Sequence, residues 1–332
     1  MGIRPALRVV LLLLALAALT VGAAGCGRDD DDGDVANAAD TTEGTTEALS
    51  GKIEIDGSST VGPLTTAAAE SFREVQPDVN VTVGVSGTGG GFERFCAGET
   101  DISNASRPID EEEEVPLCEE AGIDYTEFQV GVDALTVVVN PENDWATCLT
   151  VDQLEKIWEP AAEGKVTNWN QVDPSFPDQQ LALAGPGTDS GTFDYFTDEI
   201  NGEEGASRAD YTASEDDNVI VQAVEGDPGG LGYFGYTYFE ENQDSLKAVE
   251  IDGGEGCVAP SVETARDGSY APLSRPLFIY VKNESLHRPE VHGFVEYFLT
   301  NSIQLAEDAL FIPVPDDLVG TNLSTLESAG GT

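Results

Sequence analysis

The loop at residues 185–193 contains polar groups that could bind a ligand. It reads Gly-Pro-Gly-Thr-Asp-Ser-Gly-Thr-Phe, so three glycines and one proline disfavour regular structure, and three hydroxyls and one carboxylate lie among them. The following residues, 193–200, carry apolar side chains at helical spacing and predict a helix. A loop that opens a helix offers free backbone N–H groups and the positive end of the helix dipole, which together bind anions. The same loop also fits an ordinary helix cap, with Asp189 or Ser190 at the N-cap.

Three further loops of this kind lie between a predicted strand and a predicted helix. They share hydroxyl groups or glycines and occupy residues 57–64 (Gly-Ser-Ser-Thr-Val-Gly-Pro-Leu), 86–91 (Ser-Gly-Thr-Gly-Gly-Gly) and 101–108 (Asp-Ile-Ser-Asn-Ala-Ser-Arg-Pro). Ligands of open α/β sheets bind beyond the carboxyl ends of the strands. We therefore expect the four loops to converge on one small polyoxygen anion, which hydroxyls can hold without net charge.

Strands and helices alternate around these loops. Strands are predicted at residues 52–57, 78–85, 135–139, 181–184 and 277–282, and helices at 64–75, 92–97, 110–121, 151–159, 193–200, 218–225, 292–300 and 302–308. This alternation predicts an α/β fold with largely parallel sheets. A chain of 332 residues is long enough for two domains with a substantial core.

The charge is strongly acidic. Fifteen Lys and Arg residues stand against 62 Asp and Glu residues, for a formal net charge of −47. Binding to nucleic acid needs Lys and Arg to neutralise phosphates, so a nucleic-acid partner is excluded. The surface should stay hydrated and resist association, which fits a monomer. The acidity is consistent with adaptation to high salt or with a merely acidic lineage.

The N-terminus has the pattern of a targeting segment. Arg4 and Arg8 precede an apolar run at residues 9–21, which is too short for a comfortable membrane span and suits a signal peptide. Ala-Ala-Gly-Cys at residues 23–26 resembles the lipobox of bacterial lipoproteins, which predicts a signal peptide at 1–26 and lipidation of Cys26. A plain secretory signal cleaved near Ala24 is the alternative. Residues 27–50 are acidic and poor in apolar side chains, and they predict a disordered tether.

Cysteine usage agrees with export. Apart from Cys26, the chain has four cysteines, namely Cys96, Cys118, Cys148 and Cys257. An even number in a secreted chain predicts two disulfides, and four cysteines allow three connectivities.

The residue types argue against an enzyme. A Ser-His-Asp triad needs a histidine base, and this chain has only His287 and His292, both near the start of a predicted surface helix. No His/Cys/Asp cluster has zinc spacing, and the glycine run at 86–91 lacks the full dinucleotide fingerprint. We therefore predict a binding protein without catalytic residues, metal or cofactor.

Taken together and in order, the four loops resemble those of phosphate-binding proteins of the phosphate-specific ABC transporter. The resemblance runs from about residue 52 to 320. It implies a periplasmic-binding-protein-like (type II) fold, in which two α/β lobes flank a ligand cleft and are joined by a hinge. Lobe 1 would comprise residues 51–135 plus 276–326 and lobe 2 residues 136–275, with hinge crossings near 133–140 and 275–282. Disulfides within a lobe leave the hinge free, so the resemblance favours Cys96–Cys118 and Cys148–Cys257.

The resemblance also implies a ligand set. Its members lie in the four loops and are Ser59, Thr60, Gly87, Thr88, Ser106, Arg107, Asp189, Ser190, Gly191 and Thr192. Well-studied members of the family have an Arg where this chain has Pro186 and an Asp where it has Ser106. We therefore hypothesise that Arg107 supplies the guanidinium and Asp189 the carboxylate. An ionised Asp accepts a hydrogen bond from a P–OH group, which sulfate lacks. Asp189 acting only as a helix cap is the alternative.

The implied function is capture of inorganic phosphate outside the cytoplasm and its delivery to the permease subunits of an ABC importer. A lipid anchor on Cys26 would hold the protein at the outer face of the cell membrane. The alternatives are binding of another tetrahedral oxyanion, sulfate or molybdate, and a phosphate sensor or surface adhesin with the same lobes.

Overall fold

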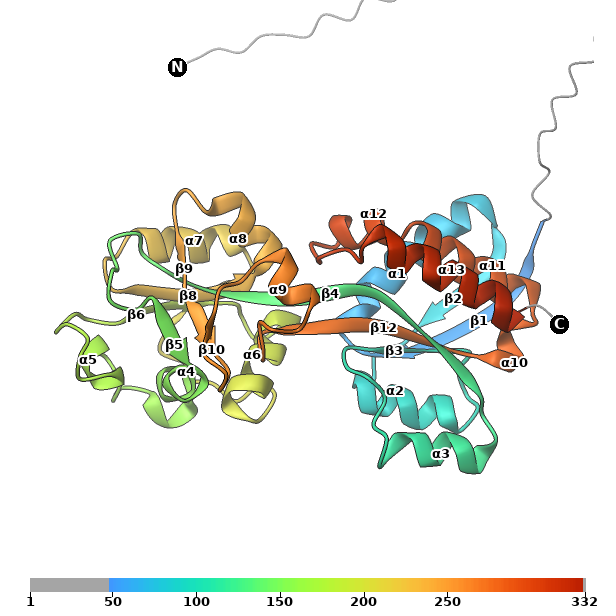
Figure 1. Cartoon of the computed structure of the whole chain (residues 1–332), viewed down its shortest axis with the longest axis horizontal. Coiled ribbons are helices and arrows are strands. Elements are labelled where there is room, and N and C mark those ends of the chain that lie inside the picture. The colour runs from blue at the N-terminus through green and yellow to red at the C-terminus, as the bar shows by residue number, and fades with distance from the viewer. Residues whose placement is uncertain (1–47, 331–332) are drawn as a thin grey trace, which may run out of the picture. The chain divides into compact units, whose positions relative to one another are not determined.

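The computed structural model describes residues 48–330 (Figure 1). The predicted signal peptide, Cys26 and nearly all of the predicted tether lie outside the described residues. Ser50, the last residue assigned to the tether, already belongs to the first strand, where it pairs with Asp78. Among residues 48–330, no helix has the length and apolar character that crossing a membrane requires.

Two groups of elements, here called lobe 1 and lobe 2, are joined by β4 (Tyr125–Val139) and β12 (Ser274–Lys282) (Figure 1). Lobe 1 contains β1 (Ser50–Gly57), α1 (Val61–Val75), β2 (Asp78–Val83), α2 (Gly87–Cys96), β3 (Ile102–Ala105), α3 (Glu114–Ala121), α10 (Asn283–Leu286), α11 (Pro289–Thr300), α12 (Ser302–Asp308) and α13 (Asp316–Gly330). The predicted end of lobe 1 at residue 326 falls inside α13, whose Leu326 is buried in the core.

Lobe 2 contains the elements between β4 and β12. They are β5 (Cys148–Thr150), α4 (Val151–Trp158), the 3₁₀ helix η1 (Pro160–Ala162), α5 (Trp169–Val172), β6 (Ala182–Gly185), α6 (Gly191–Asn201), β7 (Thr212–Ala213), α7 (Asp217–Glu225), β8 (Gly230–Gly235), α8 (Tyr236–Asn242), β9 (Lys247–Ala248), β10 (Glu250–Asp252), β11 (Cys257–Val258) and α9 (Val262–Arg266). Strands β5, β10 and β11 form a small separate sheet.

One mixed sheet runs through both lobes. Its strand order is β2-β1-β3-β12-β4-β8-β6-β7, and β9 adds to β4. Strands β1, β2 and β3 are parallel, as are β6, β7 and β8, whereas β4 and β12 run antiparallel to their neighbours. The expectation of largely parallel sheets was therefore wrong for the two long strands. The reason is that β4 and β12 cross between the lobes in opposite directions, so they meet as an antiparallel pair.

The pairing of β4 changes partner partway along the strand. Residues 125–134 pair with β12, and residues 135–139 pair with β8. Phe128 and Val130 on the first part belong to the hydrophobic core of lobe 1, whereas Leu135 and Val137 belong to that of lobe 2. Each lobe thus buries its own apolar side chains, which is the main force that holds its helices to the sheet.

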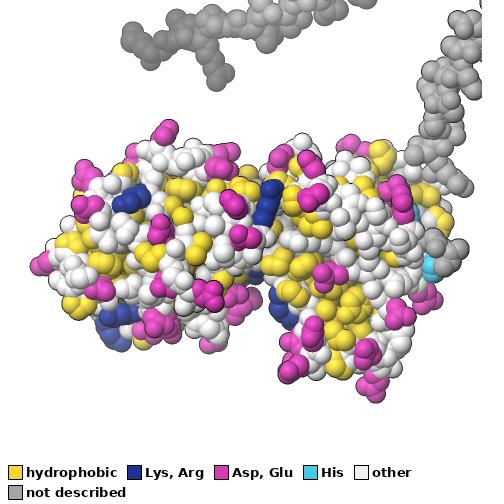
Figure 2. All heavy atoms as spheres, in the orientation of Figure 1, with side chains coloured by type: hydrophobic (Ala, Val, Ile, Leu, Met, Phe, Trp, Pro, Cys, Tyr) yellow, Lys and Arg dark blue, Asp and Glu magenta, His cyan; other side chains and the backbone are white. Residues whose placement is uncertain are grey.

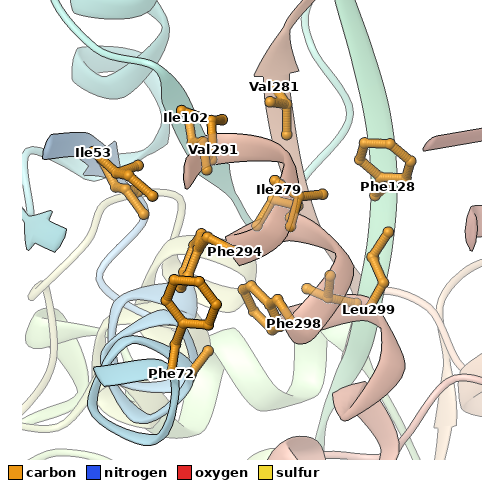
Figure 3. Packing of buried hydrophobic residues seen from close by; sticks show 14 of the residues in the cluster. Ile53, Phe72, Ile102, Phe128, Ile279, Val281, Val291, Phe294, Phe298 and Leu299 are labelled. Carbon is orange, nitrogen blue, oxygen red and sulfur yellow. The ribbon is translucent and has the colours of Figure 1, made fainter. Parts of the chain in front are cut away.

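The core of lobe 1 is rich in aromatic rings. Phe72 of α1 meets Phe294 of α11 at a centroid distance of 5.5 Å, with Phe298 one turn further along α11 (Figure 3). These rings pack α1 and α11 against the face of the sheet that carries Ile53 and Ile279. This packing sets the position of the amino terminus of α1, which carries the first of the four loops.

Helix α2 begins at Gly87, not at the predicted residue 92. The glycine run is therefore helical instead of a loop. Gly91 explains this: a Cβ on it would lie 2.5 Å from the Cα of Gly57 and 2.9 Å from Oγ of Ser103. The run lets α2 pack almost directly onto the backbone of β1, so glycine serves close packing here and not loop conformation.

Both predicted disulfides are confirmed. Cys96 is bonded to Cys118 in lobe 1, and Cys148 to Cys257 in lobe 2. Each disulfide ties together segments of one lobe, so neither restrains a movement between lobes.

Acidic side chains are spread over both lobes on the face shown in Figure 2, where Lys and Arg are few.

Candidate functional site

One pocket, here called the cleft pocket, lies where the predicted loops meet. Its volume is about 200 Å³. The lining residues are Ser58, Ser59, Thr60, Gly87, Thr88, Gly89, Ser106 and Arg107 from lobe 1, Gly191, Asp194, Tyr195, Asp198, Glu199 and Glu204 from lobe 2, and Arg275 from β12. Hydroxyls, helix amino termini and two guanidinium groups thus face a common space.

The amino terminus of α1 is organised by Ser58. Its Oγ accepts hydrogen bonds from the backbone N–H groups of Thr60 and Val61, at 3.2 and 3.4 Å. Its own N–H donates to the carbonyl of Asn104 at 2.9 Å, which fastens the loop to the end of β3. Ser58 thus holds the turn that leads into α1, and Thr60, the N-cap residue, lines the pocket beside the exposed Ser59.

The amino terminus of α2 is fastened to the same strand end. The hydroxyls of Thr88 and Ser106 lie 3.2 Å apart, and the backbone N–H of Ser106 donates to Oγ1 of Thr88 at 3.2 Å. The loops that follow β1, β2 and β3 therefore meet at one edge of the parallel part of the sheet. This is the arrangement expected for ligand binding by an α/β sheet.

Arg107 lines the pocket but is engaged elsewhere. Its Nη1 and Nη2 donate to the two carboxylate oxygens of Glu114, each at 2.8 Å, and Nη1 also donates to the carbonyl of Pro108 at 3.0 Å. The hydrogen bond to Glu114 raises the pKa of Arg107 above its ordinary value. A buried carboxylate thus neutralises this guanidinium in a two-pronged pair.

Arg275 is the second guanidinium of the pocket. Its Nε and Nη2 donate to Oδ2 of Asp133 at 3.2 and 3.1 Å, and Nη2 donates to Oγ1 of Thr60 at 2.7 Å. The ring of Tyr195 lies 3.5 Å from the guanidinium carbon. Burial raises the pKa of Asp133, and the charge of Arg275 opposes that shift. This arginine contacts elements of both lobes from the strand that joins them.

The lobe 2 wall of the pocket is acidic. Asp194, Asp198 and Glu199 lie on α6, and Glu204 follows it. Burial raises the pKa of Asp194, and the charge of Glu204 adds to this shift. Burial likewise raises the pKa of Glu199. An anion in this pocket therefore meets donors on lobe 1 and hydrogen-bond acceptors on lobe 2.

The loop at 185–193 reaches the pocket only in part. Gly191 lines it, whereas Asp189, Ser190 and Thr192 do not. Oγ of Ser190 accepts a hydrogen bond from the backbone N–H of Thr192 at 3.2 Å, so Ser190 is the N-cap of α6, one of the two caps considered above. Asp189 is exposed, and its N–H donates to the carboxylate of Glu215 at 3.3 Å. The carboxylate hypothesis for Asp189 is therefore not supported by its position.

Eight residues that line the pocket were not among those predicted from the sequence. They are Ser58, Gly89, Asp194, Tyr195, Asp198, Glu199, Glu204 and Arg275. A signal existed for Arg275, because it stands at a predicted hinge crossing next to a buried strand in a chain with only 15 Lys and Arg residues. For Asp194 the signal is helical spacing, since it lies one turn after Gly191 on α6.

Neither histidine lines this pocket. Within residues 48–330, the side chains close enough to share a metal ion are Cys148, Glu250 and Cys257, and the two sulfurs of this group are joined in a disulfide. Disulfide sulfurs are not thiolates, the form in which cysteine binds metals. We assign no metal to that group.

The fold is that of periplasmic-binding-protein-like proteins, with a pocket between two lobes. Comparison with known families agrees, because the model of a PBP superfamily domain matches residues 37–302. The protein SphX of Synechocystis is 49% identical over 274 residues, covering 82% of this chain and 81% of that protein. The phosphate-binding protein PstS of Staphylococcus saprophyticus is 39% identical over 317 residues and covers 92% of each chain.

Solved structures agree with these sequence matches. The crystal structure of a possible phosphate-binding protein from Planctomyces limnophilus is 49% identical and superimposes with a TM-score of 0.81, covering 85% of this chain and 99% of that one. An ABC-type phosphate transport receptor from Vibrio cholerae shares the fold, with a TM-score of 0.61 at 23% identity. The chain belongs to the PBP superfamily, in the family that includes SphX and the phosphate-binding protein PstS.

Proposed function

We propose that this protein binds inorganic phosphate in the cleft pocket and delivers it to the permease of an ABC importer. The observation that carries the proposal is the meeting of the α1 and α2 amino termini, the hydroxyls of Ser59 and Thr88, and the guanidinium of Arg275 around one pocket. Helix amino termini and guanidinium groups are the standard ligands of phosphate in proteins. The names of the PstS relatives support the same ligand.

Selectivity for phosphate is proposed to rest on Asp194 in place of Asp189. Asp194 is a half-buried carboxylate that lines the pocket, whereas Asp189 is exposed outside it. Phosphate at neutral pH has a P–OH group that can donate to an ionised carboxylate, and sulfate has none. A carboxylate facing sulfate would be repelled without a compensating hydrogen bond. The remaining acidic residues of α6 should reinforce this exclusion.

Calorimetric titration of the purified protein with phosphate, arsenate, sulfate and molybdate tests the function. We expect phosphate and arsenate to bind and sulfate to fail. Asp194→Asn should reduce the preference for phosphate over sulfate by at least about tenfold. Asp189→Asn is the matched comparison and should leave the preference unchanged. Tight sulfate or molybdate binding by the unaltered protein would show that its ligand is another oxyanion. An effect of Asp189→Asn alone would show that Asp189, and not Asp194, is the carboxylate that selects phosphate.

The cellular setting is also a proposal. Cys26 carries the lipid anchor and holds the binding domain, through the acidic tether, at the outer face of the cell membrane. Its support is the signal-like sequence that precedes Cys26. Metabolic labelling with a radioactive fatty acid should mark the full chain and not its Cys26→Ser variant. Loss of phosphate uptake on deletion of the gene would separate a transport role from a sensor or an adhesin.

We also propose that the protein binds its ligand without turning it over, and that it acts as a monomer. The relatives are named as binding proteins, and a histidine base is absent from the pocket lining. Turnover of a phosphoester by the purified protein would contradict the binding role. A mass above that of one chain in sedimentation equilibrium would contradict the monomer.

A further inference from the structure

We propose that Arg275, and not Arg107, is the arginine that binds the anion, and that Asp133 and Tyr195 are positioning residues that orient it. The inference rests on the proposed binding of an oxyanion in the cleft pocket and names the group that supplies its positive charge. Arg275 lies at the start of β12, directly across from Asp133 on β4 in the antiparallel register. Both strands run between the lobes, so this pair stands at the hinge.

The five N–H groups of Arg275 are divided between protein and pocket. Nε donates to Asp133, and Nη2 donates to both Asp133 and Thr60. Nη1 has no hydrogen-bond partner among residues 48–330, although the side chain is only 18% exposed and lines the pocket. Two N–H groups are thus left for a ligand, and a guanidinium can direct such a pair toward one or two oxygens of a tetrahedral anion.

Asp133 holds the plane of the guanidinium. The residue is 7% exposed, and Arg275 donates to it from two nitrogens, both onto the oxygen Oδ2. This contact uses the Nε side of the fork and leaves the Nη1 side open. Because Asp133 is too buried to stand unpaired, Arg275 is held in place even without a ligand. The anion site is therefore preorganised.

Tyr195 fixes the position of Arg275 from the other lobe. The guanidinium carbon lies 3.5 Å from the centroid of the Tyr195 ring, a close cation–π contact. The phenol oxygen donates to the carbonyl of Pro272 at 2.7 Å, which sets the ring in place. Arg275 thus contacts Thr60 at the amino terminus of α1 and Tyr195 on α6. It therefore touches both walls of the cleft pocket.

Arg107 also has a carboxylate partner and an aromatic neighbour, but its contacts are looser and more exposed. Its guanidinium carbon lies 5.8 Å from the centroid of the Phe92 ring, against 3.5 Å between Arg275 and Tyr195. Glu114 occupies both of its terminal nitrogens in a two-pronged pair, and its side chain is 46% exposed. Water competes with an exposed guanidinium for the ligand. Arg107 also keeps two N–H groups without a partner among residues 48–330, but its side chain is the more exposed of the two. The less exposed unpaired donors of the pocket belong to Arg275.

Phosphate titration by calorimetry at constant ionic strength tests this inference. Arg275→Gln should weaken binding by about 100-fold, because two charge-assisted hydrogen bonds are lost. Arg107→Gln should weaken it by no more than about fivefold. Arg266→Gln is the matched control, since Arg266 lies on α9 outside the pocket and donates to the carbonyl of Pro313. It should bind phosphate as the unaltered protein does.

Arg275→Gln leaves Asp133 without its partner and could impair folding. The double variant Arg275→Gln with Asp133→Asn removes the pair together and should bind as weakly while melting normally. Arg275→Lys keeps the charge and should rescue little, because an ammonium lacks the planar fork that holds Asp133 on one edge and directs N–H groups to the anion on the other. If the unaltered protein binds no oxyanion, the proposed function itself fails. If it binds phosphate and the double variant binds within threefold of it, the assignment of Arg275 is overturned.

A double-mutant cycle tests the positioning role of Tyr195. Tyr195→Leu removes the ring and should weaken phosphate binding by about threefold to tenfold. In the Arg275→Gln background the same substitution should have no further effect, because the guanidinium that it orients is gone. Equal losses in the two backgrounds would mean that Tyr195 acts only through the packing of α6, and would overturn this part of the proposal.

Discussion

Glu114 accepts two hydrogen bonds of 2.8 Å from the guanidinium of Arg107, and a third of 2.8 Å from the backbone N–H of Asp110. A buried carboxylate in lobe 1 therefore neutralises one of the two arginines that line the cleft pocket. Glu114 does not itself line the pocket. It therefore offsets the charge of Arg107 from outside the pocket lining.

Glu114→Gln should strengthen phosphate binding. The substitution keeps the size of the side chain and removes the charge that offsets Arg107, for a gain of about 1 kcal/mol, or about fivefold in affinity. The melting temperature should fall, because a buried network loses its charge-assisted bonds. Calorimetry and thermal melts measure the two effects. Glu99→Gln, at an exposed carboxylate paired with Arg94, is the control. Weaker binding by Glu114→Gln would show that Arg107 must be held in place to act.

Gly91→Ala should destabilise the protein by about 1–3 kcal/mol. A Cβ there would lie 2.5 Å from the Cα of Gly57, so α2 would have to move away from β1. Gly89→Ala, on the same helix, is the matched comparison, since a Cβ there would lie 3.9 Å from the side chains of Arg107 and Glu114. That variant should melt about as high as the unaltered protein or higher, because Ala favours a helix over Gly. Equal melting of the two variants in a thermal scan would refute the packing argument.

Removal of the disulfide Cys148–Cys257 should cost more stability than removal of Cys96–Cys118. The two bonds span 109 and 22 residues. Loop closure in the unfolded chain predicts losses of about 5 and about 3 kcal/mol respectively. Paired Cys→Ser variants compared by urea denaturation give the two values. Phosphate affinity should stay nearly constant in both, as each bond lies within one lobe, and the reverse order of stability would contradict the prediction.

Asp217→Asn should stabilise the protein above about pH 6. Burial, with the nearby charges of Asp216 and Glu215, raises the pKa of Asp217 to about 6. An unfolded Asp has a pKa of about 3.9, so between about pH 4 and 6 the native state binds more protons and stability falls as pH rises. The variant lacks this loss. Because the side chain is partly exposed, the expected gain at pH 7 is about 1 kcal/mol.

Urea denaturation at pH 4 and pH 7 measures the contribution of Asp217. The difference between the variant and the unaltered protein should nearly vanish at pH 4, where Asp217 is protonated in the native state. A gain of the same size at both values would point to helix propensity at the start of α7 instead of to charge.

The sequence alone determined the order of the elements and the nature of the loops. Apolar periodicity located α1, α4 and α6 to within a few residues, because a helix that packs on a sheet must repeat its buried side chains every three to four positions. Hydroxyls and glycines after successive strands predicted an anion site, since parallel strands end at a common edge. Glycines placed for close packing, such as Gly91, were mistaken for loop residues, because both uses have the same residue type.

Tertiary structure decided which of these groups face the same space. Arg275 and Tyr195 are 80 positions apart, and Arg275 and Thr60 are 215 apart, yet they meet in one pocket. Local pattern carries no information on contacts between the ends of different strands and helices, so it favoured Arg107 and Asp189, which lie within the recognisable motifs. The pairing of β4 with β12 brought the hinge arginine to the cleft, and the cap formed by Ser190 left Asp189 exposed. Three-dimensional packing thus decided, among charged side chains that the sequence shows equally, which ones line the cleft pocket.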